Sequence, residues 1–103
     1  MHPLIQQRLG GLRALCLKHR VHRLALFGSA GADYFDPATS DVDLLVEFQP
    51  MSPAEHANHY FELREDLERM LGMSVDLVEP GPIRNPYFRR SLDETRKVIY
   101  EAA

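Results

Sequence analysis

The stretch that decides the fold is Leu24–Phe48, LALFGSAGADYFDPATSDVDLLVEF. Its apolar runs predict two strands, Val42–Phe48 and Arg23–Phe27, and we expect the latter to be buried on both faces. The polar segment between the strands begins with Gly28-Ser29 and ends with Asp41-Val42-Asp43. Two carboxylates at the edge of a hydrophobic core repel each other. A bound positive charge is therefore expected beside Asp41 and Asp43.

Two longer segments have the periodicity of helices. Apolar residues at helical spacing predict an amphipathic helix near residues 3–19, with Gly10-Gly11 as a weak point. The run Ser52-Pro53-Ala54-Glu55 is typical of a capping box with proline at the first helical position. The helix that starts there is predicted to end at Gly72.

The last third of the chain completes the pattern. Ser74–Glu79 predicts a third strand, and the turn Pro80-Gly81-Pro82 closes it. A short helix is expected to begin near Asn85-Pro86, followed by Lys97–Tyr100 as a brief strand or a helical tail. The chain is therefore predicted to be one α/β (α+β) domain over residues 1–103, with a small mixed sheet of three to four strands flanked by helices.

Composition excludes several classes of function. With 103 residues, the chain has room for one modest core. A formal net charge of −3 argues against a surface that coats nucleic acid, so no stable nucleic-acid binding is expected. The single cysteine, Cys16, fits a reducing compartment. The sequence shows neither a signal peptide nor an apolar run that could span a bilayer, so a cytoplasmic location is expected.

The spacing of Asp41 and Asp43 is suited to a metal ion. Residues two apart on a strand point to the same side, with their Cα atoms roughly 6–7 Å apart. Carboxylate oxygens so placed can share a hard cation, and Mg²⁺ commonly takes one or two carboxylates together with substrate phosphates. Mg²⁺ would remove the repulsion and create a phosphate site.

Two further elements extend this prediction. Asp76, in SVDLVEP, would join the same polar face if its strand pairs beside Asp41 and Asp43, and three such carboxylates can hold two metal ions. Gly28 allows a phosphate to approach the backbone closely, and the Ser29 hydroxyl and the following N–H groups can donate to phosphate oxygens.

Each feature has a simpler interpretation when it is taken singly. Gly-Ser after a strand is usually a turn, an isolated Asp-x-Asp is usually solvated, and Asp76 could lie on an edge strand. Their combination in one order, namely strand, Gly-Ser, loop, Ser-Asp-x-Asp, strand, helix and then a third Asp within a strand, favours a joint site.

Other polar groups are open to two interpretations. His56 and His59 have the spacing of a metal pair on a helix, but without a further ligand we interpret them as solvated or half-buried. Tyr34 and Phe35 could stack on a base or pack over the loop itself. The arginines that follow the third strand form either a solvated helix face or a source of cations for a phosphate or partner site: Arg84, Arg89 and Arg90.

The whole pattern resembles the signature of the polymerase-β-type nucleotidyltransferase superfamily: a hydrophobic strand, Gly-Ser, a spacer and Asp-x-Asp. More narrowly, the chain is similar to the minimal nucleotidyltransferases of prokaryotes over nearly its full length, including VDLVEP and the closing NPYFRRSLDETRKVIYEA. The resemblance implies the nucleotidyltransferase fold.

The same resemblance implies roles for individual residues and for partners. Gly28 and Ser29, with Ser40, would bind the nucleotide, and Asp41, Asp43 and Asp76 would bind Mg²⁺, two ions in all, and serve catalysis. Proteins of this kind are commonly paired with an all-helical HEPN toxin as its antitoxin. In that setting the resemblance implies transfer of AMP from ATP to a tyrosine of the partner.

One departure from the family pattern divides the functional hypotheses. Many relatives read Gly-Ser-x-Ala-Arg-Gly, whereas this chain has Ala32 at the arginine position, followed by Asp33. The complete set of aspartates favours an Mg²⁺-dependent transferase. The missing cation favours a non-catalytic antitoxin that neutralises its partner by direct binding, with nucleotide as an optional ligand. A transferase acting on a small molecule is disfavoured, because the chain offers no second domain to enclose the substrate.

Overall fold

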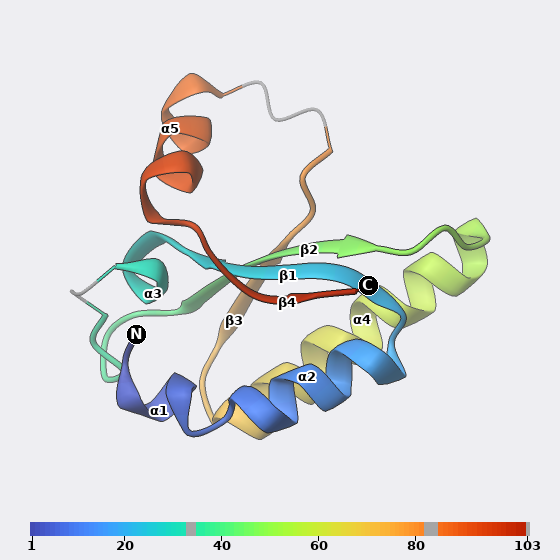
Figure 1. Ribbon diagram of the computed structural model, residues 1–103, viewed down its shortest axis with the longest axis horizontal. Helices are drawn as coiled ribbons and strands as arrows, with labels where there is room; N and C mark the ends of the chain where they lie inside the picture. The colour runs from blue at the N-terminus through green and yellow to red at the C-terminus, as the bar shows by residue number, and fades with distance from the viewer. Residues whose placement is uncertain (33–34, 82–84, 103) are drawn as a thin grey trace.

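The computed structural model describes residues 1–32, 35–81 and 85–102. Its helices and strands follow one another along the chain as Figure 1 shows. Their bounds are α1 Pro3–Gln6, α2 Leu9–Lys18, β1 Val21–Phe27, α3 Gly28–Gly31, β2 Val42–Phe48, α4 Pro53–Leu71, β3 Val75–Val78, α5 Pro86–Thr95 and β4 Lys97–Glu101.

The strands form one mixed sheet in the order β3-β2-β1-β4. β1 pairs antiparallel with both β2 and β4, whereas β2 pairs parallel with β3 because α4 crosses over between them. The prediction of a small mixed sheet flanked by helices is confirmed. The two alternatives for the end of the chain are also resolved, since Lys97–Glu101 is a strand.

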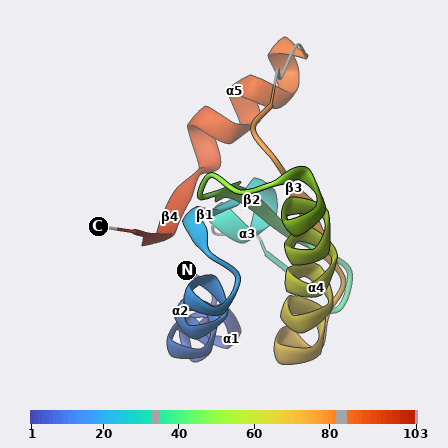
Figure 2. The same ribbon diagram turned by 90° about the vertical axis from the view of Figure 1, so that its right-hand side faces the viewer.

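The sheet separates two unequal apolar layers. α2 and α4 lie together below it in Figure 2, and α5 lies above it. The main core fills the lower layer, where alternate β2 residues such as Val42 and Leu44 pack against Leu63 and Leu67 of α4. A smaller cluster lies beneath α5 and contains Ala25, Phe27, Leu45 and Leu92. The side chains between those of the main core therefore face α5.

The N-terminal helix differs from the prediction. Instead of one helix over residues 3–19, the chain forms α1 and α2, and the break lies at Gln7-Arg8 rather than at Gly10-Gly11. Gly11 packs closely against α4, because a methyl group at its Cα would lie 2.8 Å from the Met70 side chain. The glycine thus allows two helices to approach, which local propensity alone does not indicate.

The boundaries of α4 agree with the sequence prediction. The Ser52 hydroxyl accepts a hydrogen bond from the Glu55 backbone N–H at 3.2 Å, which is the expected capping interaction. At the other end, Gly72 adopts a left-handed conformation with φ +67°. None of the helices in the described ranges is long and apolar enough to cross a membrane.

The backbones of α3 and α5 approach each other closely at the end of the sheet where β1 ends. Gly28 donates its N–H to the Thr95 hydroxyl at 2.7 Å. A methyl group at Gly31 would overlap with the backbone carbonyl of Thr95 and press on that of Leu26. Backbone carbonyls cannot rotate away as a side chain can, so this contact requires glycine.

We predict that Gly31→Ala lowers the free energy of unfolding by about 1–3 kcal/mol, the usual cost of overpacking. The matched change Gly10→Ala meets no atom within 4 Å and lies in α2. It should raise the free energy of unfolding by about 0.5–1 kcal/mol, because alanine is the better helix former. Urea denaturation of both variants measures the difference. Equal effects would contradict the close approach of α3 and α5.

A candidate carboxylate site beside a glycine-serine turn

The parallel pairing of β2 with β3 brings two of the candidate aspartates together. Asp43 lies in register with Asp76, and the preceding pair is Val42 with Val75. Both valines are buried in the main core, so the two aspartates project from the opposite face of the sheet, toward the side of α5. Asp41 immediately precedes β2 and is exposed.

The Gly28-Ser29 turn lies directly against Asp43. Phe27, the last residue of β1, is in register with Asp43 across the antiparallel pair. Gly28 has φ +60°, and a methyl group on it would collide with the Asp43 carboxylate. A side chain here would therefore be both strained and obstructed, so the turn requires glycine at this position.

Asp43 is electrostatically unfavourable in its charged form. Burial, followed by the negative charges of Asp76 and then Asp41, raises the pKa of Asp43 from its ordinary 3.8 to about 6. Among the described residues, no basic side chain forms an ion pair with any of the three. An uncompensated group of oxygen donors on adjacent strands is chemically suited to a hard divalent cation such as Mg²⁺. The residues present thus fit that ion.

The two candidate serines occupy different parts of the site. Ser29 lies in α3 directly after Gly28 and is half-buried. Ser40 is also half-buried, and its N–H donates to the Asp36 carbonyl oxygen at 2.8 Å, which closes the loop before β2. Both precede the three aspartates in the chain, and among the described residues neither hydroxyl has a side-chain hydrogen bond that identifies its role.

A comparison with known families identifies the group to which this chain belongs. The model of the nucleotidyltransferase domain matches residues 11–99, which include all three aspartates and the Gly-Ser turn. The chain is a member of the nucleotidyltransferase domain family. Its sheet, with the carboxylates at one edge and the Gly-Ser turn beside them, is thus a nucleotidyltransferase fold.

The chain is also similar to individual proteins and solved structures. A proposed protein adenylyltransferase of Methanocaldococcus jannaschii is 39% identical over 77 residues, which are 75% of each chain. The structure of a proposed minimal nucleotidyltransferase is 29% identical, with a TM-score of 0.67 and 90% of each chain covered. A chain in the complex of a tri-AMPylated Shewanella oneidensis HEPN toxin with an MNT antitoxin is 18% identical, with a TM-score of 0.60 and coverage of 94% of this chain and 72% of that one. At that identity the similarity shows the fold alone.

The loop that follows the Gly-Ser turn is described only in part. Ala32, where the resemblance predicts an arginine, is half-buried in an extended conformation. Asp33 and Tyr34 lie outside the described residues. Phe35 is buried and packs edge-on against His2 with ring centroids 5.4 Å apart, so of its two expected roles it takes the packing one.

The basic residues in and beside α5 differ in their surroundings. Arg90 forms an ion pair with Glu94 at 3.5 Å, and Arg84 lies outside the described residues. Arg89 and Arg96 line a pocket of about 120 Å³ together with Leu45, which is two residues beyond Asp43 on the same face of β2. Neither Arg96 nor Thr95 was predicted from the sequence as a residue near the site. The helical spacing of residues 89, 92, 93 and 96 was the available signal, because it places them on one face.

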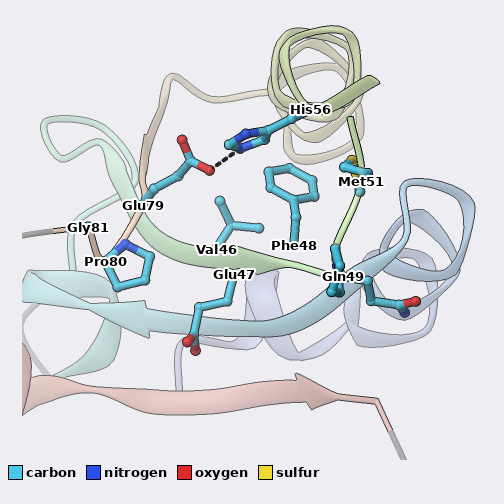
Figure 3. Close-up of a pocket in the computed structure, with 10 residues that line it drawn as sticks. Val46, Glu47, Phe48, Gln49, Met51, His56, Glu79, Pro80 and Gly81 are labelled. Atoms are coloured by element: carbon cyan, nitrogen blue, oxygen red, sulfur yellow. Dashed lines mark hydrogen bonds and ion pairs between the residues drawn. The ribbon is translucent and has the colours of Figure 1, made fainter. Parts of the chain in front are cut away.

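Another pocket, formed by described residues, does not include the carboxylates. Its volume is about 460 Å³, and it lies at the other end of β2 (Figure 3). His56 and Glu79 form an ion pair at its rim. His59 does not join them and instead contacts His19. Both histidine side chains are half-buried, which agrees with the interpretation made from the sequence. Residues that line the pocket include Val46, Glu47, Phe48, Gln49, Met51, Pro80 and Gly81.

The raised pKa of Asp43 predicts a pH-dependent penalty in metal-free protein. The folded state holds this proton more tightly than the unfolded chain, so stability falls as the pH rises from about 4 to about 6. We expect Asp43→Asn to raise the free energy of unfolding at pH 7.5, in chelator, by about 1 kcal/mol after allowance for solvent screening. The gain should vanish near pH 4. Denaturation at both pH values measures it.

The control for this measurement is Asp93→Asn, which makes the same chemical change at an exposed position of α5. A surface change of this kind should alter stability by no more than about 0.5 kcal/mol at either pH. A stability gain for Asp43→Asn that is equal at pH 4 and pH 7.5 would show that packing, rather than charge, is responsible.

Proposed function

We propose that this nucleotidyltransferase is an Mg²⁺-dependent protein adenylyltransferase that moves AMP from ATP to a hydroxyl, that of a tyrosine, on a HEPN-type toxin, and so acts as its antitoxin. The observation that carries the proposal is the register of Asp43 with Asp76 beside the Gly28 turn. The proposed protein adenylyltransferases among its relatives support the reaction, and the HEPN complexes with a similar fold support the partner.

Each residue has a proposed part in the reaction. Asp41, Asp43 and Asp76 would hold the metal, which when bound neutralises phosphate charge and activates the attacking oxygen. Gly28 contributes by having no side chain, because its N–H is already bonded to Thr95. Ser29 and Ser40 would donate hydroxyl hydrogen bonds to the nucleotide.

The transfer is an in-line displacement at phosphorus. The acceptor hydroxyl oxygen forms a bond to the α-phosphorus of ATP, the bond from that phosphorus to the bridging oxygen breaks, and pyrophosphate leaves. Asp76 is exposed and acts as the general base that takes the hydroxyl proton, or as a further metal ligand. Its exposure suits a macromolecular acceptor, which must approach from solvent.

Two arginines, one in α5 and one directly after it, would supply the positive charge that Ala32 lacks. Arg89 and Arg96 line the pocket that adjoins Leu45, on the face from which Asp43 projects. A nucleotide that extends from the carboxylates toward this pocket would bring its phosphates within reach of guanidinium groups, which bind phosphate oxygens in pairs.

A second candidate function is favoured by Ala32 itself. A domain without the loop cation could neutralise the toxin by contact and hold nucleotide without transferring it. We propose a cytoplasmic location for either function, with no stable nucleic-acid binding, in keeping with the net charge of −3.

Labelling of the partner distinguishes the two functions. We expect the chain, Mg²⁺ and ATP labelled on the α-phosphate to transfer label to a co-encoded HEPN-type protein. Asp43→Asn should reduce transfer to background, because it removes a metal ligand from the centre of the set. Glu65→Gln, which makes the same carboxylate-to-amide change at an exposed position of α4, should retain full activity. Neutralisation of the toxin by Asp41→Asn and Asp43→Asn variants, without any label in the wild type, would instead establish the binding function.

The proposed phosphate role is tested by two arginines, Arg90 within α5 and Arg96 directly after it. We expect Arg96→Gln to raise the KM for ATP about tenfold, the loss of roughly one charge-assisted hydrogen bond. Arg90→Gln should leave KM unchanged, because Arg90 is paired with Glu94. Initial-rate kinetics measure both. Equal KM values for the two variants would exclude Arg96 from the nucleotide site.

A further inference from the structure

A second group of metal-ligating side chains lies at the opposite end of the sheet. His19 follows α2 directly, and His59 and Glu62 are three residues apart on α4. One ligand atom from each of these three residues lies within 4.8 Å of the others. The group adjoins Val21, whereas the carboxylate site adjoins Phe27, six residues farther along β1 and therefore about 20 Å away.

His19 is held in one orientation by a carboxylate. Its side chain is only 1% exposed, and its Nε2 lies 2.8 Å from Asp66 Oδ2. Because a carboxylate only accepts hydrogen bonds, Nε2 must carry the proton. Lys18 and Arg69 also pair with Asp66, at 3.0 and 3.3 Å, and support its negative charge. In the neutral ring, the Nδ1 atom of His19 therefore presents its lone pair.

That lone pair is directed at a second imidazole. His19 Nδ1 and His59 Nδ1 are 3.1 Å apart, and the two rings are inclined at 81°. Two histidine nitrogens bound to one tetrahedral Zn²⁺ at about 2.0–2.1 Å lie roughly 3.3 Å apart. The observed separation is thus close to that of two ligands on one ion.

Glu62 completes the group from the solvent side. It is exposed and lies one turn beyond His59 on the same face of α4, with Asp66 one turn farther. Within the described ranges, no hydrogen bond or ion pair engages the Glu62 carboxylate. Its side chain is therefore available as a third ligand at the open side of the site.

We propose that His19, His59 and Glu62 bind one Zn²⁺, with water as the fourth ligand and with Asp66 orienting His19 from behind. A carboxylate that accepts from the second ring nitrogen of a metal-bound histidine is a general feature of such sites. Two imidazoles favour Zn²⁺ and similar transition metals over Mg²⁺, which prefers oxygen. The ion would pin the end of α2 to α4, beneath the sheet that carries the carboxylates.

Cys16 does not compete for the ion. It lies one turn before His19 on α2, but burial raises the pKa of its thiol to about 12. Its sulfur is also not among the ligand atoms that lie within 4.8 Å of one another in this group. The ligand set consists of nitrogen and oxygen donors.

Calorimetric titration of chelator-treated protein with ZnCl₂ tests the proposal. We expect one equivalent to bind, and Co²⁺ to give the absorption of a tetrahedral site at the same stoichiometry. His59→Gln should weaken Zn²⁺ binding at least about a hundredfold, and the surface change Glu62→Gln about tenfold. His56→Gln removes a histidine from the same helix but outside the group, and should bind as the wild type does.

Three outcomes would overturn the proposal. The first is no zinc binding by the wild type, and the second is unchanged zinc affinity in both His59→Gln and Glu62→Gln. The third is loss of zinc binding in Asp43→Asn, which would assign the ion to the carboxylate site. Because Glu62 is exposed, its variant should keep the fold even if His59→Gln does not. Zinc binding that persists in Asp43→Asn and is weakened in Glu62→Gln supports the proposal.

Discussion

The parallel pairing of β2 with β3 is the constraint on which the rest of the site depends. It sets Asp43 opposite Asp76, and the alternation of side chains along each strand turns both away from the main core. A shift of one residue would bury these carboxylates and expose the valines beside them. Burial of the apolar residues therefore fixes the register, and the same register brings the negatively charged carboxylates close enough to repel each other.

That cost is concentrated on Asp43. Its carboxylate is partly buried, next to two like charges and against the glycine turn, and its pKa is raised accordingly. A binding site for a hard cation is often unfavourable in the absence of the ion, because the donors must already be close together. The repulsion noticed between two aspartates in the sequence is thus a property of the folded structure as well.

The sheet also separates two kinds of polar chemistry. Oxygen donors gather where β1 ends and β2 begins, and α5 is tied to that edge through Thr95 and Gly28. Histidine nitrogens gather at the other end, between α2 and α4. The first group belongs to the family fold and carries the proposed transfer. The histidine group depends on how α2 and α4 pack below the sheet, and a metal ion bound there would hold these two helices together.

The sequence by itself determined the strands around Gly28 and Asp43, the capping of α4 and the family, because these depend on local patterns of apolar, turn and acidic residues. The position of the break in the N-terminal helix could not be predicted from local propensity. Gly11 lies within α2, and its lack of a side chain is explained by the close contact with Met70. Spacing along the chain relates His59 only to His56, three residues away, whereas the folded chain brings His59 against His19. Only the tertiary structure decided this contact, and with it the approach of Arg96 to the carboxylate face, because contacts between distant segments follow from packing across the sheet rather than from spacing along the chain.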